Sequence, residues 1–384
     1  MAFDFDEIIN RRIHGDIKYM PVNGRDDILP LWVADMDFRA PDCVRRALIA
    51  QAEYSVFGYQ IPDKEYDSLV CEWQRKQFQW SIKAEWLIKT PGVMFAVSSS
   101  IKALTNEGDG VLIFQPVYPP FANVVKHNKR QLFVSELYLN NGRYVMDFAD
   151  VESQLSKGTI KALLFCSPHN PVGRVWEKEE MEQLAALCLR YDVKIISDEI
   201  HADFVYPNSR HIPFASLSED IAASTVTCTA PTKTFNLASI QVSNMIISND
   251  SVRHAVQAQV YATGYSSINS MAIAACKAVY RDGKDWLDEL IRYLAENRRI
   301  LTEAFPSDRK IRISAPEGTY LAWLDFRSLR ISDNELNRAL LYTSGVRLNT
   351  GESFGKGGSG FMRLNFACPH STLIEAIKRI KTIL

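Results

Sequence analysis

The sequence of 384 residues lacks a charge excess of either sign, because 44 Lys and Arg side chains stand against 45 Asp and Glu, for a formal net charge of −1. It therefore has no electrostatic footprint for nucleic acid or an anionic membrane. No run approaches the roughly 18 apolar residues of a membrane span, and the acidic start MAFDFDEIINRR lacks the basic-then-apolar order of a signal peptide. We expect a cytoplasmic protein with neither a nucleic-acid nor a membrane partner.

Disulfide and metal frameworks are also missing. The seven cysteines are scattered, odd in number and without a CxxC pair, so we expect small core residues in a reducing compartment and no metal site. With 47% hydrophobic and 23% charged residues, the chain has enough apolar material for a large core. We expect it to divide into two compact units.

Between about residues 110 and 248, short apolar runs alternate with amphipathic stretches, as in βαβ units. Apolar residues at helical spacing predict a helix over 178–192. The clearest predicted strands are GVLIFQP, KALLFCSP, VKIISDE, STVTCTA and VSNMIIS. This pattern predicts an α/β fold with a mainly parallel sheet.

After about residue 285 the pattern changes to a charged helical segment followed by strand-like TYLAWLDF and FMRLNFA, which indicates a smaller α+β unit. A final helix is predicted over STLIEAIKRIKTIL, with Thr372 and Glu375 as a capping box. The first fifty residues carry few sheet signals. We expect them to pack with the C-terminal unit.

Polar side chains follow three of the predicted strands where each strand ends: Asn170, Asp198 and Lys233. In open α/β sheets, ligands gather beyond the carboxyl ends of the strands. A lysine amine forms an imine with an aldehyde, a carboxylate keeps a ring nitrogen protonated, and an amide hydrogen-bonds a phenolic oxygen. Each residue alone has a plainer interpretation, as a surface lysine, a helix cap or a turn residue. As a set, they suit a pyridine aldehyde cofactor.

With their flanking residues, these segments resemble the fold-type I pyridoxal 5'-phosphate (PLP) enzymes, the class I/II aminotransferase superfamily. The similar segments are SPHNPVGRVW, SDEIH, TKTFNLASIQ and FMRLNFA, and the resemblance covers nearly the whole chain. It implies a fold-type I α/β architecture with a mainly parallel central sheet in a large PLP-binding domain, residues 49–285. A smaller α+β domain is then formed by the two chain ends, residues 1–48 and 286–384.

A closer resemblance is to the carbon–sulfur lyase branch typified by MalY and PatB, which are cystathionine β-lyases. It rests on LPLWVADMDF, FGYQIP, TPGVMFAV, PVYPPF, DEIHADF and GTYLAWLDF. The resemblance implies β-elimination from L-cystathionine or related cysteine S-conjugates, giving a thiol, pyruvate and ammonia. Amino-group transfer is an alternative because it uses the same residues. A regulatory protein that binds a transcription activator is a second alternative, either in place of the enzyme or as a second role of it.

The resemblance also implies the residues of the site. Lys233 is the catalytic residue and carries the cofactor, and Arg363 offers a planar fork to the substrate carboxylate. The other implied cofactor contacts within one subunit are Gly92, Val93, Met94, Tyr118, Asn170, Asp198, His201 and Thr232. Tyr59 is implied to reach the phosphate of the cofactor across the interface of a homodimer. Asn170 and Tyr118 are expected to bind substrate as well.

The chain departs from many aminotransferases at the eighth residue after the lysine, where Gln241 replaces an arginine that holds the phosphate. The phosphate is then expected to rely more on backbone dipoles and hydroxyl groups. The Gly-rich stretch GESFGKGGSG, residues 351–360, precedes no helix. It is predicted to be a lid or turn and not a phosphate loop.

Overall fold

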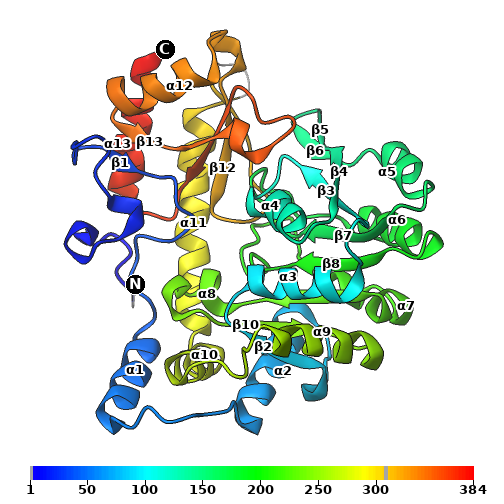
Figure 1. Cartoon of the computed structure of the whole chain (residues 1–384). Helices are drawn as coiled ribbons and strands as arrows, with labels where there is room; N and C mark the ends of the chain where they lie inside the picture. Colours follow the sequence, from blue (N-terminus) through cyan, green and yellow to red (C-terminus); the bar gives the residue numbers. More distant parts are fainter. Residues whose placement is uncertain (1–2, 307–309) are drawn as a thin grey trace.

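The computed structural model describes residues 3–306 and 310–384 (Figure 1). Its centre is a seven-stranded sheet in which β10 is antiparallel to both neighbours and the other neighbouring strands are parallel. The order is β2 (Leu87–Thr90), β10 (Ser243–Ile246), β9 (Thr225–Thr229), β8 (Lys194–Asp198), β7 (Ile160–Cys166), β3 (Gly110–Gln115), β4 (Gln131–Glu136). The mainly parallel sheet and its five predicted strands are confirmed.

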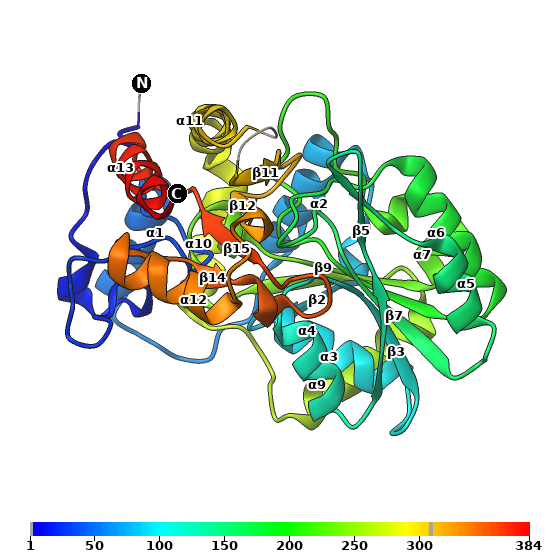
Figure 2. The same cartoon turned by 90° about the horizontal axis from the view of Figure 1, so that it is seen from above.

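Helices cover both faces of this sheet, which is why its inner strands are continuous apolar runs. Figure 2 shows α3 (Val93–Leu104), α4 (Pro120–His127) and α9 (Asp250–Ala262) on one face, and α5 (Phe148–Leu155), α6 (Lys178–Arg190) and α7 (Glu219–Ala223) on the other. Two separate apolar clusters fill these layers. The predicted helix over 178–192 is α6, which ends two residues earlier.

A second, antiparallel sheet of four strands lies beside the first, in the order β11 (Arg312–Ser314), β12 (Leu321–Asp325), β15 (Phe361–Asn365), β14 (Asn349–Thr350). It packs with α11 (Lys284–Ala304), α12 (Asp333–Arg338) and α13 (His370–Ile380). The remaining elements are β5 (Tyr138–Asn140), β6 (Arg143–Val145), α1 (Asp42–Tyr54), α2 (Lys64–Phe78), α8 (Pro231–Thr234) and α10 (Ser270–Asp282).

The two chain ends pack together, as Figure 1 shows in blue and in orange to red. The short strand β1 (Leu29–Pro30) pairs in parallel with β13 (Val346–Arg347), and Leu31 shares one apolar cluster with Leu364. The N-terminal segment therefore lies against the C-terminal sheet, as expected. The division of the chain at residues 48 and 285 stays a prediction.

The predicted capping box at the C-terminal helix is wrong. Helix α13 begins at His370, directly after Pro369, so Thr372 lies inside the helix and no side chain caps its start. Glu375 instead forms an ion pair with Arg379, one turn further along, at 2.7 Å. None of the helices described is long and apolar enough to cross a membrane.

Candidate active site

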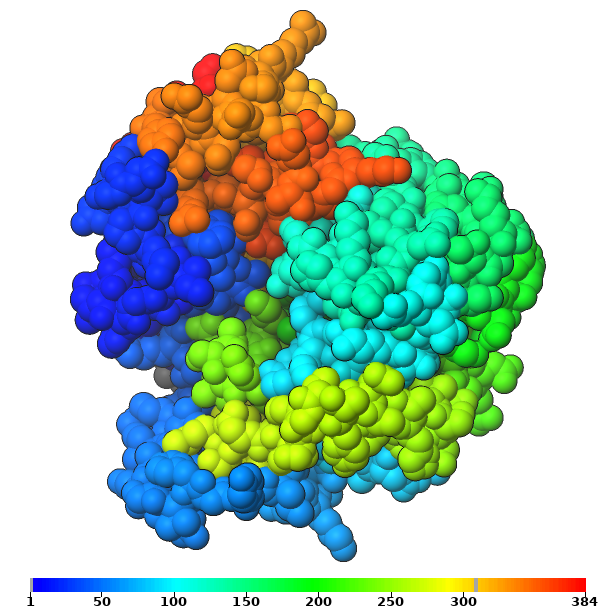
Figure 3. Space-filling view, viewed as in Figure 1, coloured from blue at the N-terminus to red at the C-terminus, as the bar shows by residue number. Residues whose placement is uncertain are grey.

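A cavity of about 480 Å³ opens at the carboxyl ends of β7, β8 and β9, where the large sheet meets the C-terminal sheet. In Figure 3 the surface is hollowed where the blue N-terminal segment, the orange C-terminal segment and the cyan and green parts meet. The structure brings most of the predicted site residues to this cavity: Gly92, Val93, Met94, Tyr118, Asn170, His201, Lys233 and Arg363. Residues from six separate stretches of sequence therefore converge.

Three predicted residues do not line the cavity. Asp198 lies at the end of β8, next to the cavity residue Cys166 on β7, and its side chain is buried. Thr232 is buried within α8, one residue before Lys233. Tyr59 is fully exposed on the segment between α1 and α2, outside the cavity of its own chain.

Lys233 enters the cavity from α8, a single turn that begins with Pro231 at its first position, where a missing N–H costs nothing. Its Nζ donates a hydrogen bond to the Ala34 carbonyl oxygen at 2.5 Å. Burial, and secondarily the charge of Arg363, lower the pKa of the Lys233 amine to about 8, although Asp35 and Asp198 oppose the shift. The pKa of this amine is thus closer to neutral pH than the pKa of an ordinary lysine.

Asp198 shows the opposite shift. Burial, assisted by the neighbouring Glu199 carboxylate, raises the pKa of Asp198 to about 7, against the backbone hydrogen bond from Ile200 and the charge of Lys233. The Ile200 N–H donates to Asp198 Oδ1 at 3.1 Å, and no ion pair within 4 Å joins Asp198 to any residue that the structure describes. A cation brought next to this carboxylate would stabilise its charged form.

Arg363 reaches the cavity from β15 and is buried. Its two terminal nitrogens donate to Asn170 Oδ1 at 3.0 Å, to Asn349 Oδ1 at 2.7 Å and to the Trp32 carbonyl oxygen at 2.8 Å. Its Nε is buried without a hydrogen-bond partner among the described residues. Burial lowers the pKa of Arg363 to about 10. The guanidinium is therefore held in one orientation and is poorly solvated.

Asn170 sits on a loop that a glycine makes possible. Gly173 has a φ of 73°, in the left-handed region, and a Cβ there would lie 2.6 Å from Pro316. The loop thus packs closely against the segment before β12, and the Asn170 carbonyl accepts a hydrogen bond from the Tyr118 N–H at 3.1 Å. This contact fixes Tyr118 and Asn170 relative to each other at the cavity wall.

The start of α3 supplies unpaired donors. Gly92 precedes the helix, no side chain caps it, and the first N–H groups of any helix lack intrahelical partners. With the positive end of the helix dipole, these groups suit an anion such as a phosphate. His201 adds an Nδ1 atom that is buried without a hydrogen-bond partner among the described residues. The cavity thus holds an anion-binding end and several unused polar groups.

Sequence reasoning missed part of the lining. Trp32, Val33, Ala34 and Asn349 also face the cavity, as does Phe354, whose ring lies under the Arg363 guanidinium at 5.0 Å. The signal for the first three was the stretch LPLWVADMDF, which carried the resemblance but received no role. Phe354 belongs to the Gly-rich stretch predicted as a lid or turn; residues Gly351–Phe354 form a 3-10 turn.

Comparisons with known proteins identify the family of the chain. The family model "Aminotransferase class I and II" matches residues 26–380. Cystathionine beta-lyase PatB of Bacillus subtilis is 41% identical over 363 residues, which cover 94% of each chain. Among solved structures, cystalysin from Treponema denticola, which contains PLP, has a TM-score of 0.96 at 36% identity and covers 100% of this chain and 98% of its own. The PLP-bound C-S lyase from Staphylococcus hominis has a TM-score of 0.92 at 30% identity, with coverage of 100% and 98%.

Proposed function

Since the chain belongs to the aminotransferase class I and II family, we propose that it is a PLP-dependent carbon–sulfur β-lyase acting on L-cystathionine or related cysteine S-conjugates. The products are a thiol, pyruvate and ammonia. The observation that carries the proposal is that a lysine of lowered pKa and an arginine fork meet at one cavity, with a buried aspartate of raised pKa directly beside its wall. The relatives named as cystathionine β-lyase and C-S lyase support the reaction class.

The residues present fit the cofactor. Asp198 is a buried carboxylate that forms no ion pair with any residue that the structure describes, and the start of α3 offers free N–H groups for a phosphate. His201 has an unused buried nitrogen, and we propose that it and Asn170 face the ring oxygen. When bound, PLP would supply an electron-accepting ring that stabilises negative charge at the substrate Cα.

Lys233 and Arg363 then act on the substrate itself. Arg363 binds the α-carboxylate, and the neighbouring Asn170 holds the guanidinium in plane through a 3.0 Å hydrogen bond. Lys233, with its pKa near 8, moves the proton at Cα, because burial keeps a useful fraction of its amine uncharged near neutral pH. Loss of that proton precedes departure of the thiolate from Cβ.

Amino-group transfer remains the second candidate, because the same arrangement of Lys233, Asp198 and Arg363 serves both reactions. Binding of a transcription activator stays a prediction that concerns a surface and not this cavity. A purified enzyme separates the two reactions: we expect steady release of pyruvate from L-cystathionine without an added keto acid, and none from Lys233→Ala. A strict requirement for a keto acid would reject the lyase.

We also propose a homodimer. The segment between α1 and α2 exposes a run of large apolar side chains, and Tyr59 at its centre is fully exposed. Such a surface is typical of an interface. In a dimer this segment would bring Tyr59 to the phosphate of the partner subunit's cofactor. The free cysteines described, mostly buried, support the proposed cytoplasmic location.

A further inference from the structure

Residues 32–37, from Trp32 to Asp37, form an irregular segment that lines the cavity with its first three residues and that we call the strap. It follows β1, and backbone bonds fix it at both ends: the Asn365 N–H donates to the Leu31 carbonyl and the Asp37 N–H to the Ala367 carbonyl, each at 2.9 Å. The strap forms no strand or helix of its own. Its main-chain carbonyl groups are therefore available to side chains.

Both proposed substrate-handling residues use those carbonyls. Arg363 donates to the Trp32 carbonyl at 2.8 Å, and Lys233 donates to the Ala34 carbonyl at 2.5 Å. The Tyr320 hydroxyl donates to the same Ala34 oxygen at 3.0 Å. Arg363 comes from the C-terminal sheet and Lys233 from the large sheet, so the strap is the common support of the two.

Two asparagines, Asn365, which is buried, and Asn236, which is half-buried, hold the strap from the same two sides. Asn365, two residues after Arg363 on β15, donates to the Val33 and Asp35 carbonyls at 2.6 and 2.5 Å. Asn236, three residues after Lys233, accepts from the Met36 N–H at 3.0 Å and donates to the Met36 carbonyl at 2.9 Å. The strap is thus bound to the segments that carry Lys233 and Arg363 by a second set of contacts.

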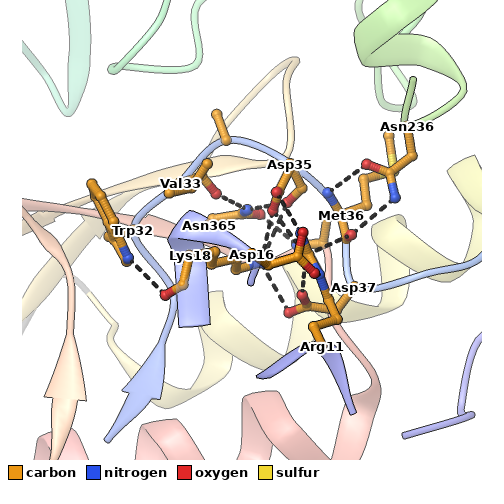
Figure 4. A network of polar contacts seen from close by, with 12 residues as sticks. Arg11, Asp16, Lys18, Trp32, Val33, Asp35, Met36, Asp37, Asn236 and Asn365 are labelled. Carbon is orange, nitrogen blue, oxygen red and sulfur yellow. Dashed lines mark hydrogen bonds and ion pairs between the residues drawn. The ribbon is translucent and has the colours of Figure 1, made fainter. Parts of the chain in front are cut away.

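The N-terminal segment supplies the cations that complete this support (Figure 4). Arg11 donates to Asp35 at 2.7 Å and to Asp37 at 2.7 Å, and also reaches the Met36 carbonyl at 3.1 Å. Lys18, whose side chain is fully buried, lies 2.9 Å from Asp37 and 3.3 Å from Asp35. The Asp37 carboxylate is buried and that of Asp35 is partly exposed, and both cations stabilise the pair.

We propose that the strap sets the relative position of Lys233 and Arg363, and that Arg11 is the positioning residue that holds it. Arg11 does not line the cavity: its guanidinium donates to Asp16, Asp35, Met36 and Asp37, and it lies over the Tyr19 ring at 5.3 Å. Among the residues that the structure describes, no hydrogen bond of the strap goes to Gly92 or Asp198, and Lys233 is its one link to the proposed cofactor contacts. The loss of kcat/KM in an Arg11 variant is therefore expected to exceed any loss of affinity for PLP. The catalytic part of this inference rests on the proposed function.

The experiment compares Arg11→Met, which removes the charge and the fork, with Arg11→Lys, which keeps the charge. Arg39→Met is the matched control, because Arg39 is an exposed arginine two residues after the strap that pairs with Glu7. Hydrogen exchange of the PLP-loaded protein is followed by mass spectrometry in peptides that contain the Met36 and Asp37 amides. Separately, kcat/KM for L-cystathionine and the dissociation constant for PLP are measured.

Arg11→Met is expected to speed exchange of the strap amides by about tenfold and to lower kcat/KM, measured at saturating PLP, by about tenfold, with a smaller loss of affinity for PLP. Arg11→Lys is expected to lie between it and wild type, and Arg39→Met to match wild type. Faster exchange with unchanged kcat/KM, or parallel losses of kcat/KM and PLP affinity, would overturn the positioning role.

Two further outcomes remain informative. If Arg11→Met does not fold, the same comparison is made between Arg11→Lys and wild type. The inference is overturned if hydrogen exchange and kcat/KM in Arg11→Lys equal those of wild type. If wild-type protein releases no pyruvate, the proposed function fails on its own. Exchange at the strap still decides whether Arg11 holds it, because that readout needs no turnover.

Discussion

Replacing Arg363 with lysine is expected to lower the affinity of the loaded enzyme for amino acids by about 10- to 150-fold. A lysine presents one ammonium where the guanidinium presents two parallel N–H donors, so at least one charge-assisted hydrogen bond to the substrate carboxylate is lost. Such a bond contributes about 1.5–3 kcal/mol, and each 1.36 kcal/mol is about tenfold in an equilibrium or rate constant. The Asn170 and Asn349 oxygens that fix Arg363 cannot restore the missing donor.

The assay is a visible-absorbance titration of the PLP-loaded protein with L-alanine and with ethylamine, which lacks the carboxylate. The dissociation constant for L-alanine should rise in Arg363→Lys, whereas that for ethylamine should not. Arg327→Lys is the control, because Arg327 is an exposed arginine of the same region that pairs with Asp325. Equal losses for both ligands, or no loss for L-alanine in folded Arg363→Lys, would refute carboxylate recognition by this residue.

Asp198→Asn is expected to reduce kcat by about 100- to 1,000-fold, the range for removing one electrostatic stabiliser, in steady-state pyruvate assays. The folded-state pKa of Asp198, about 7, lies above the ordinary value of 3.8, so its stability contribution is complete below about pH 4 and is lost as pH rises towards 7. At about pH 8, cofactor-free Asp198→Asn should therefore unfold at a higher temperature than cofactor-free wild type, and this difference should shrink at about pH 4. The same pH dependence of the unfolding temperature in both proteins would contradict the raised pKa of Asp198. Tyr59→Phe is expected to weaken PLP binding by about tenfold. A hybrid dimer of one Tyr59→Phe subunit and one Lys233→Ala subunit should contain one site with wild-type affinity for PLP, because that site combines the intact Lys233 of one subunit with the intact Tyr59 of the other. A site built within one subunit excludes this result.

The strands that were predictable are those buried on both faces. Strand β7 is a run of apolar residues with a single exposed position, and its length alone separates it from a helix. Strands β2 and β4 were missed for physical reasons. Strand β2 is a short edge strand whose apolar run is broken by Lys89, and β4 is an edge strand with partly exposed side chains, so neither gives a continuous apolar signal. Their place in the sheet comes from pairing with distant residues.

The site was predictable where chemistry resides in side chains at strand ends. Lys233 and Arg363 carry recognisable flanking residues, and the structure brings both to one cavity. The strap was not predictable, because it contributes backbone carbonyls, which every sequence has. The pairing of Lys18 with Asp37 was equally hidden, since charged residues 19 positions apart normally lie on the surface and no periodicity marks a buried pair.

Burial moves the pKa of three groups at the cavity towards the neutral form: Asp198 upwards, and Lys233 and Arg363 downwards. In such a medium each charge is best stabilised by an opposite charge that a ligand brings, because water is excluded and the effective dielectric constant is low. An amine without the α-carboxylate would leave the Arg363 charge desolvated and without a counter-charge. The binding free energy lost in this way is larger than that of the missing hydrogen bonds alone. We therefore expect selectivity for α-amino acids to arise from the desolvation of Arg363 as much as from the shape of its fork.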